Sequence, residues 1–170
     1  MQLPGGHLIV LDLQPVAPPA SPTSLAAGGR FERRLAAIRA KYSGGDGAGL
    51  ALPDGGDLPE AAKAFFSPHF LFTRLDATAA GHAAVRSTVR EAYRDYVGLY
   101  LELLKAAAAE GPIRDPARAA EVRRGHVAYM NYRAEKDPAR GMLTRMFGPE
   151  WTERLIHEVL FDWAERPEGK

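Results

Sequence analysis

Only two segments of the chain have the pattern of β-strands, and roughly fifty residues separate them. The first begins within the first few residues, alternates apolar side chains between two faces through residues 7–14, and ends at Pro15. The second, residues 65–75, is rich in aromatic side chains and contains Ser67-Pro68 near its start. Because a two-stranded sheet is marginally stable, the pattern predicts that these strands belong to a larger sheet.

Most of the remaining chain has the periodicity of amphipathic helices. A Pro/Ser/Gly-rich loop, residues 17–30, and a glycine-rich loop, residues 43–57, flank the first of them. The predicted helices span residues 31–42, 83–110 and 119–135. A short helical segment is predicted to open at Pro138, and a last one follows Gly148-Pro149, with Trp151, Leu155, Val159 and Trp163 as its buried stripe. The sequence therefore predicts an α/β chain whose second half is helical.

Length and composition predict a single soluble domain, residues 1–170. The apolar fraction of 46% is sufficient for a core, and no apolar run approaches the roughly 18 residues of a membrane span. The N-terminus does not have the pattern of a signal peptide, so we expect a cytoplasmic protein with no membrane partner. A net charge of +1 is far from the basic footprint of nucleic-acid-binding domains, so no nucleic-acid partner is expected.

The chain contains no cysteine, which excludes disulfides, thiolate catalysis and cysteine-ligated metal centres. An electron-transfer role would therefore need an external iron–sulfur donor. The histidines at positions 7, 69, 82, 126 and 157 show no metal-ligand spacing such as H-E-x-x-H, so we expect no metal site.

Three segments, residues 3–15, 58–74 and 137–162, resemble the ferredoxin-dependent bilin reductases and occur in the same order. The first two resemble a core strand of these enzymes and the next strand with its lead-in. The third resembles their C-terminal signature through Asp137-Pro138, then Phe147-Gly148-x-x-Trp151-x-Glu153-Arg154, then Val159-Leu160-Phe161-Asp162. Together the three segments span nearly the whole chain, and three in register are specific.

This resemblance implies a three-layer α/β/α sandwich with a central antiparallel sheet flanked by helices. It also implies ferredoxin-dependent reduction of a linear tetrapyrrole, biliverdin IXα or a dihydrobiliverdin, to a phycobilin. Residues 55–74 look more like the phycoerythrobilin-forming members. Because the bilin itself accepts the electrons, no bound cofactor is expected, and reduced ferredoxin is the external donor and protein partner.

The same resemblance implies that the sheet is incomplete here. Family members carry further strands before the Gly-Gly that matches Gly5-Gly6, and a catalytic aspartate shortly before it. We therefore expect residues 1–170 to be the C-terminal portion of a bilin reductase fold, N-terminally truncated. The alternatives are a bilin-binding remnant without catalysis and a helical protein-interaction module.

Asp137 is the candidate catalytic residue. An aspartate followed by a proline at the first helical position is a common helix opening, so the residue pattern alone favours an N-cap. By the resemblance, the matching residue lies in the loop over the bilin and donates a proton or positions the pigment. Each electron added to a tetrapyrrole makes it more basic, and a positioned acid can then supply the proton.

Basic side chains are the candidate binding residues. By the resemblance, three arginines bind the bilin propionates, whose carboxylates suit the guanidinium fork. They are Arg74, Arg133 and Arg140. Three further cations dock ferredoxin, because a basic patch steers an acidic partner. They are Arg123, Arg124 and Lys136. The alternative is that the cations of this helical region form the solvated face of a helix.

Asp12 is a weaker candidate for a catalytic acid. It shares a strand face with Leu8 and Val10, at the end of the first strand. Its alternative is a strand-end aspartate that contacts solvent or a neighbouring loop.

Overall fold

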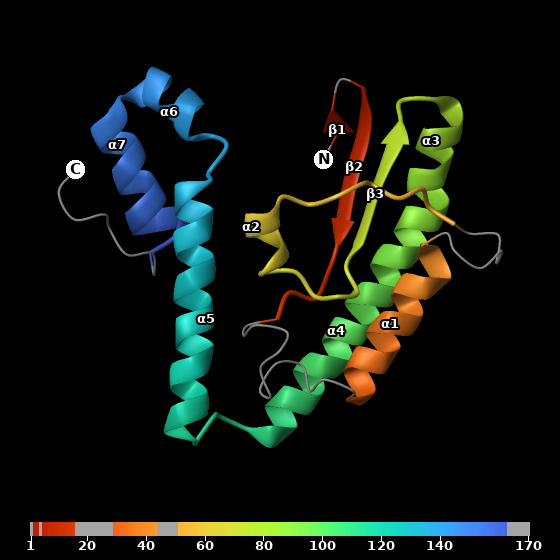
Figure 1. Ribbon diagram of the computed structural model, residues 1–170, viewed down its shortest axis with the longest axis horizontal. Coiled ribbons are helices and arrows are strands. Elements are labelled where there is room, and N and C mark those ends of the chain that lie inside the picture. The colour runs from red at the N-terminus through yellow and green to blue at the C-terminus, as the bar shows by residue number, and fades with distance from the viewer. Residues whose placement is uncertain (1, 4, 16–28, 44–50, 163–170) are drawn as a thin grey trace. The chain divides into compact units, whose positions relative to one another are not determined.

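The computed structural model describes residues 2–3, 5–15, 29–43 and 51–162. The chain divides into two compact units, Met1–Pro112 and Ile113–Lys170. The first contains the sheet and its helices, and the second is helical (Figure 1). The α/β class is confirmed, whereas the three-layer sandwich and the single domain over residues 1–170 stay predictions.

The sheet of the first unit is antiparallel, in the order β1 (Gln2–Leu3), β2 (Gly6–Leu11) and β3 (Leu71–Asp76). The β2–β3 register runs from Gly6 opposite Asp76 to Leu11 opposite Leu71. Gly6 has a φ of 154° and a side chain there would lie 2.2 Å from the carbonyl oxygen of Leu75, so only glycine fits this close pairing.

The strand predicted for residues 65–75 is wrong in its first half. Strand β3 begins only at Leu71, because the preceding residues form turns. The amide of Phe70 donates to the carbonyl of Ser67 at 3.3 Å, and Ser67 itself bonds to another loop. Phe65, Phe66 and Phe70 therefore lie in turns before the sheet, and Phe72 is the aromatic residue of β3.

Five helical segments are found among the described residues of the first unit. They are α1 (Arg30–Tyr42), α2 (Glu60–Lys63), α3 (Ala79–Ala84), the π-helical segment η1 (Val85–Val89) and α4 (Arg90–Glu110). The helix predicted from residue 83 begins four residues earlier because the Thr78 side chain accepts from the amide of Gly81 at 3.1 Å and caps α3. The α2 helix was not predicted.

One apolar core closes one face of the sheet against α1 and α4, which lie side by side (Figure 1). Ile9, Leu11 and Leu13 pack against it from β2 and the segment that follows. Its buried members are Leu35, Tyr42, Leu52, Leu71, Leu75, Val89, Ala92, Tyr96 and Leu99. Leu52 comes from the predicted glycine-rich loop, and its amide donates to the carbonyl of Tyr42 at 2.8 Å.

The second unit contains α5 (Pro116–Glu135), α6 (Arg140–Phe147), α7 (Pro149–Arg154) and the π-helical segment η2 (Leu155–Leu160). Asp115 caps α5 by accepting from the amide of Ala117 at 3.0 Å, so this helix begins three residues before its predicted start. Gly148, with a φ of 84°, makes the sharp turn between α6 and α7.

The buried stripe predicted for the last helix is wrong. Trp151 and Val159 are 45% and 68% exposed, whereas Thr152 and Ile156 are fully buried. Ile156 packs with Ala134 of α5, so the contact with α5 selects the buried face. Trp163 lies outside the described residues. None of the helices among the described residues has the length and hydrophobicity needed to cross a bilayer.

Candidate functional site

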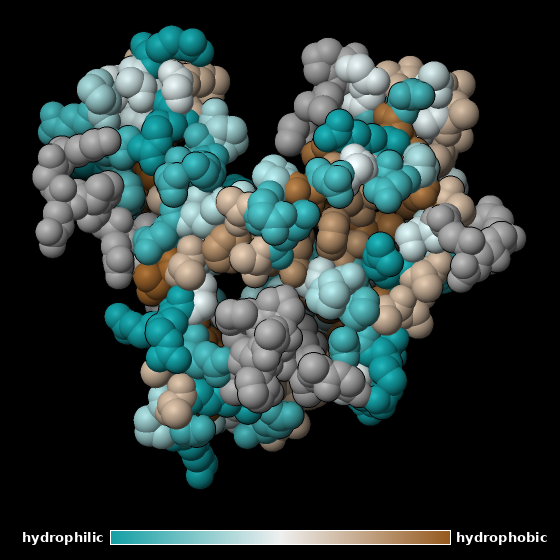
Figure 2. Space-filling view, in the orientation of Figure 1, coloured by the Kyte–Doolittle hydropathy of each residue, from teal (hydrophilic) through white to brown (hydrophobic). Residues whose placement is uncertain are grey.

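The face of the sheet opposite the core carries the predicted propionate ligand Arg74. Leu8 pairs with Arg74 and Val10 pairs with Phe72, and side chains of directly opposed residues lie on the same face. Arg74 is exposed, with its guanidinium carbon 5.5 Å from the centroid of the Phe72 ring. Val10 is 36% exposed, and Figure 2 shows hydrophobic residues at the surface over this part of the sheet. By the same register the exposed Asp76 is on this face, so the face combines apolar side chains with Arg74 and an acidic residue at the end of β3.

Gly55 covers Phe72 from the loop before α2. Its amide donates to the carbonyl of Phe72 at 3.0 Å. A side chain at Gly55 would lie 2.7 Å from the Phe72 ring, so the loop can approach this closely only with glycine there. The loop leaves Phe72 almost fully buried and fixes the ring beneath Arg74.

Asp12 follows β2 and is bound by the loop before β3. This agrees with the alternative prediction for Asp12, a strand-end aspartate that contacts a neighbouring loop. Its carboxylate accepts from the Ser67 amide at 2.8 Å and from the Ser67 hydroxyl at 2.5 Å. Burial raises the pKa of Asp12, and the Ser67 hydrogen bonds oppose this shift. The Tyr96 hydroxyl donates to the carbonyl of His69 at 2.9 Å in the same loop. Burial, and then the negative charge of Asp12, raises the pKa of Tyr96.

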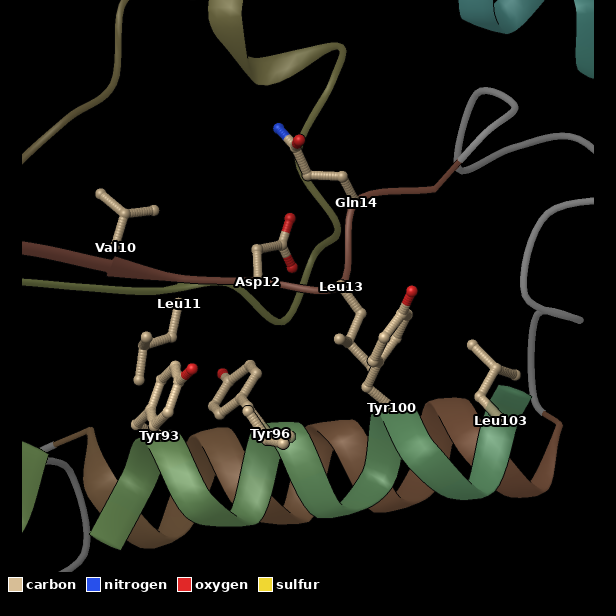
Figure 3. Close-up of a pocket in the computed structure, with 10 residues that line it drawn as sticks. Val10, Leu11, Asp12, Leu13, Gln14, Tyr93, Tyr96, Tyr100 and Leu103 are labelled. Atoms are coloured by element: carbon tan, nitrogen blue, oxygen red, sulfur yellow. The ribbon is translucent and has the colours of Figure 1, made fainter. Parts of the chain in front are cut away.

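A cavity of about 380 Å³ lies between the end of β2 and α4. Figure 3 shows Leu11 and Leu13 pointing toward α4, whereas Val10, Asp12 and Gln14 point away from it. The cavity is lined by Val10, Leu11, Asp12, Leu13, Gln14, Tyr93, Tyr96, Val97, Tyr100 and Leu103. Tyr100 borders this cavity and is 45% exposed, whereas its neighbour Leu99 lies in the core.

Asp137 lies in a tight turn between α5 and α6. Its carboxylate accepts from the amide of Ala139 at 2.8 Å, and its carbonyl accepts from the amide of Arg140 at 3.3 Å. The helix predicted to open at Pro138 begins at Arg140, because Pro138 and Ala139 form a turn before it. The predicted N-cap role of Asp137 is therefore wrong, because the N-cap of α6 is Ala139, which has no side-chain cap bond, and Asp137 instead holds the turn before this helix. Its role in proton transfer stays a prediction.

Arg140 makes bonds within the second unit through both ends of its guanidinium. One nitrogen donates to Glu153 of α7, and the other donates to the carbonyl of Ala134 in α5. The second carboxylate oxygen of Glu153 lies 3.5 Å from Nε2 of His157, whose side chain is 7% exposed. Nδ1 of His157 is buried and has no hydrogen-bond partner among the residues that the structure describes. Glu153 is part of the C-terminal signature and His157 is one of the five histidines of the chain, but neither was predicted to contact this turn, because nothing local marks their contacts with distant residues.

The remaining predicted cations lie along α5 and at its end. Arg133 is exposed, with its guanidinium carbon 5.9 Å from the Phe161 ring centroid. Lys136 ends the helix, and its ammonium lies 2.6 Å from Glu135, which raises the pKa of Lys136. Arg123 and Arg124 are exposed and roughly 15 Å along the helix from its end. The structure thus brings Arg140 and Lys136 to the Asp137 turn, but not Arg123 and Arg124.

Potential metal ligands do not cluster in the part of the chain that the structure describes: no group of three or more histidine or acidic side chains there could hold an ion. The chemistry that the described sites offer is that of carboxylates, guanidinium groups and tyrosine hydroxyls.

The model of the family described as "Ferredoxin-dependent bilin reductase" matches residues 1–162. The chain belongs to this family. The resemblance of its three segments is thereby confirmed. Among curated relatives of this bilin reductase chain, the phycoerythrobilin:ferredoxin oxidoreductase of Synechococcus sp. (strain CC9902) is 46% identical over 160 residues, which are 94% of the chain and 57% of the relative. The one of Gloeobacter violaceus (strain ATCC 29082 / PCC 7421) is 42% identical over 172 residues, 98% of the chain and 61% of the relative.

A solved structure shares the fold of this bilin reductase chain. It is phytochromobilin synthase from tomato in complex with biliverdin, with a TM-score of 0.61 and 24% sequence identity, over 96% of this chain and 53% of that one. The chain therefore spans little more than half the length of the proteins it matches.

Proposed function

We propose that this chain acts in the ferredoxin-dependent reduction of a linear tetrapyrrole, biliverdin IXα or a dihydrobiliverdin, to a phycobilin. The observation that carries the proposal is the match of 94% of the chain, at 46% identity, to a phycoerythrobilin:ferredoxin oxidoreductase. The tomato protein of the same fold binds biliverdin. Adding hydrogen across one double bond of a bilin takes two single electrons, which ferredoxin supplies, and two protons, which the protein or water supplies.

The bilin binds on the face of the sheet opposite the core, in a fold that is an α/β/α sandwich. Leu8 and Val10 offer this face apolar contact with a planar pigment, and Arg74, above the covered Phe72 ring, offers a guanidinium to a propionate. Arg133 is a second propionate ligand, because its side chain is exposed and lies at the end of α5 near the Asp137 turn. The opposite face of the sheet is filled by the core, apart from the cavity between the end of β2 and α4.

Asp137 supplies a proton to the reduced bilin. Its carboxylate is held by the Ala139 amide, which fixes its direction, and a held acid within hydrogen-bond reach can protonate an electron-rich pigment. Reduction by single electrons passes through a radical that becomes more stable once it is protonated. Without the acid, the reaction would stall at this radical.

The substitution Asp137→Asn separates proton donation from the hydrogen bond that holds the turn. The oxygen of an asparagine side chain can accept from the Ala139 amide as the carboxylate does, but an amide cannot donate the proton. We expect biliverdin to bind normally and the ferredoxin-driven rate to fall by about 10²–10⁴, with a radical or partly reduced intermediate visible in the absorbance spectrum. Asp115→Asn is the matched control, because Asp115 caps α5 with the same geometry.

The outcomes discriminate the candidate functions. Normal kinetics and product from Asp137→Asn would leave this residue only the role of holding the turn. A shifted and sharpened bilin spectrum without ferredoxin-driven bleaching in the wild-type chain would favour a bilin-binding remnant. The absence of any spectral shift would contradict the proposal and favour an interaction module.

Ferredoxin docks on the basic side chains of α5 and its end, Arg123, Arg124 and Lys136. Arg123 and Arg124 are exposed next to each other, and clustered cations speed the association of an acidic partner. We expect Arg124→Glu to lower kcat/KM for ferredoxin about tenfold at low salt and the loss to shrink at high salt. Arg86→Glu, an exposed position in η1 of the first unit, is the control. Turnover that is insensitive to salt at subsaturating ferredoxin would contradict this dock.

A further inference from the structure

A single guanidinium connects the two ends of the turn that carries Asp137. Arg140 donates from one side-chain nitrogen to the carbonyl of Ala134, in the last turn of α5. Its own amide donates to the carbonyl of Asp137 at 3.3 Å, and the Asp137 carboxylate accepts from the amide of Ala139. The Arg140 bond to Ala134 therefore closes residues 134–140 into a loop. Within this loop, the amide of Ala139 holds the carboxylate of Asp137.

The other side of the guanidinium is fixed to α7. Glu153 accepts from Arg140 with one carboxylate oxygen and lies with the other 3.5 Å from Nε2 of His157. The His157 side chain is 7% exposed, and the neighbouring Ile156 is fully buried against Ala134. Glu153 is thus held between a cation and a nearly buried imidazole, on a helix that the small core of this unit anchors.

These contacts compete with the propionate role predicted for Arg140. To form a bidentate bond with a ligand carboxylate, the guanidinium would have to release both Ala134 and Glu153. The Ala134 residue is buried, so its carbonyl would lose a bond that water does not readily replace. Glu153 would also place its negative charge beside the incoming carboxylate. Arg140 is therefore poorly suited to bind a propionate while the turn keeps this geometry.

We infer that Arg140 is a positioning residue, which holds the Asp137 carboxylate in place by bridging Ala134 and Glu153, and that it does not bind the bilin. The inference rests on the proposed role of Asp137 as proton donor. Proton transfer requires the acid within about 2.6–3.2 Å of its target, and a displacement of about 1 Å can cost a hundredfold in rate. The bonds of Arg140 to the Ala134 carbonyl and to Glu153 restrict the movement of the turn, and they can therefore keep the Asp137 carboxylate within this distance of its target.

The test uses Arg140→Lys, which keeps the positive charge but loses the planar fork that reaches two acceptors. We expect the hydrogen–deuterium exchange of the Ala139 amide to become about tenfold faster, because its bond to Asp137 opens more often. The affinity for biliverdin should stay within about twofold, and the ferredoxin-driven rate should fall by about ten- to a hundredfold. Arg145→Lys, on the exposed side of α6, should leave all three unchanged.

The outcomes separate this inference from the proposed function. Slower exchange or no change at Ala139 in Arg140→Lys would overturn the positioning role, whatever the activity. A biliverdin affinity that falls about tenfold with unchanged exchange would identify Arg140 as a propionate ligand instead. A wild-type chain that does not bind biliverdin would contradict the proposed function, and the exchange measurement would still decide whether Arg140 holds the turn.

Glu153→Gln provides a second variant in case Arg140→Lys unfolds the chain, which circular dichroism would reveal. The amide keeps an oxygen acceptor but removes the charge that holds the guanidinium. We expect a smaller increase in Ala139 exchange, about threefold, at unchanged biliverdin affinity. Unchanged exchange in a folded Glu153→Gln would count against the bridge.

Discussion

The two units differ in how their apolar side chains pack. In the unit of residues 1–112, apolar side chains from strands and helices form one core. In the unit of residues 113–170, the buried apolar cluster consists of Ala134 and Ile156, with Met130 and Phe161 packed against it. The helices of the second unit are joined by the bonds of Arg140 to Glu153 and Ala134. Its surface also exposes large apolar side chains, among them Met146, Phe147 and Val159. Packing therefore stabilises the first unit, and directional polar bonds have a larger share in the second.

This difference matters for the candidate sites. A packed core is tolerant of small rotations but resists changes of volume, so it suits the face on which a pigment is supported. A turn held by hydrogen bonds is more sensitive to single atoms, which suits a residue that must present a proton in one direction. The comparison predicts that substitutions in the first unit reduce stability, whereas substitutions around Asp137 reduce rate.

The largest expected effect on stability is that of Leu99→Ala. Leu99 is 1% exposed within the core of the first unit, and truncation of such a side chain leaves a cavity that costs about 2–5 kcal/mol. Leu101→Ala is the matched control, because Leu101 is 51% exposed on the same helix and should change the free energy of unfolding by less than about 0.5 kcal/mol. Urea unfolding measures both. Equal losses would show that α4 is not packed as described.

Two glycines, one in each unit, test whether the backbone is packed more closely in the first unit than in the second. A side chain at Gly81 would lie 2.0 Å from the carbonyl oxygen of Asp76, so Gly81→Ala must push α3 away from the end of β3. We expect a loss of about 1–3 kcal/mol. Gly141, in α6 of the second unit, has nothing within 4 Å of such a side chain, so Gly141→Ala should stabilise by up to about 1 kcal/mol through helix propensity. A stabilised Gly81→Ala in thermal unfolding would contradict this difference.

Local sequence signals predict the long elements well. The periodicity of residues 31–42 predicts a helix that the structure has at Arg30–Tyr42, and the alternation through residues 7–14 predicts β2. The Asp-Pro signal predicts that a helix opens at Asp137-Pro138, but in the structure a turn precedes that helix. The same signal at Asp115-Pro116 was not used in the prediction, although α5 begins there directly. The same dipeptide therefore has different outcomes, because the bond from Arg140 to Ala134 holds the second one in a turn.

The family and the position of Asp137 in a loop could be predicted, but the contacts that define the sites could not. Ser67 bonds to Asp12 across 55 residues of sequence, and Arg140 bonds to Glu153 across 13. Neither spacing belongs to one helix or one strand, so no periodicity reveals it. The exposed Trp151 was predicted to be buried for the same reason, since only the position of α5 decides which face of the last helix is covered.

Asp12 provides a pH-dependent test of the first unit. Because burial raises its pKa above the ordinary value, the folded chain binds this proton more tightly than the unfolded chain. The resulting stability is present below the pKa of the unfolded state and is lost as the pH rises through the pKa of the folded state. The amide introduced by Asp12→Asn cannot ionise, so wild type should lose stability relative to this variant as the pH rises above about 4, the ordinary pKa of an aspartate. Parallel curves of unfolding free energy against pH would refute this assignment.

The smallest expected effect compares one ion pair from each unit. Arg34 and Glu102 join α1 to α4 with side chains 43% and 46% exposed, and Arg140 and Glu153 are 30% and 46% exposed. Exposed pairs contribute about 0.2–1 kcal/mol in double-mutant cycles, and salt screens them. We expect the Arg140–Glu153 coupling to lie near the upper end, because the bond to Ala134 already fixes its guanidinium and less side-chain entropy is lost. The coupling of Arg34 with Glu102 should lie near the lower end and vanish at high salt. A larger coupling in the first unit would mean that polar bonds are not the distinguishing feature of the second.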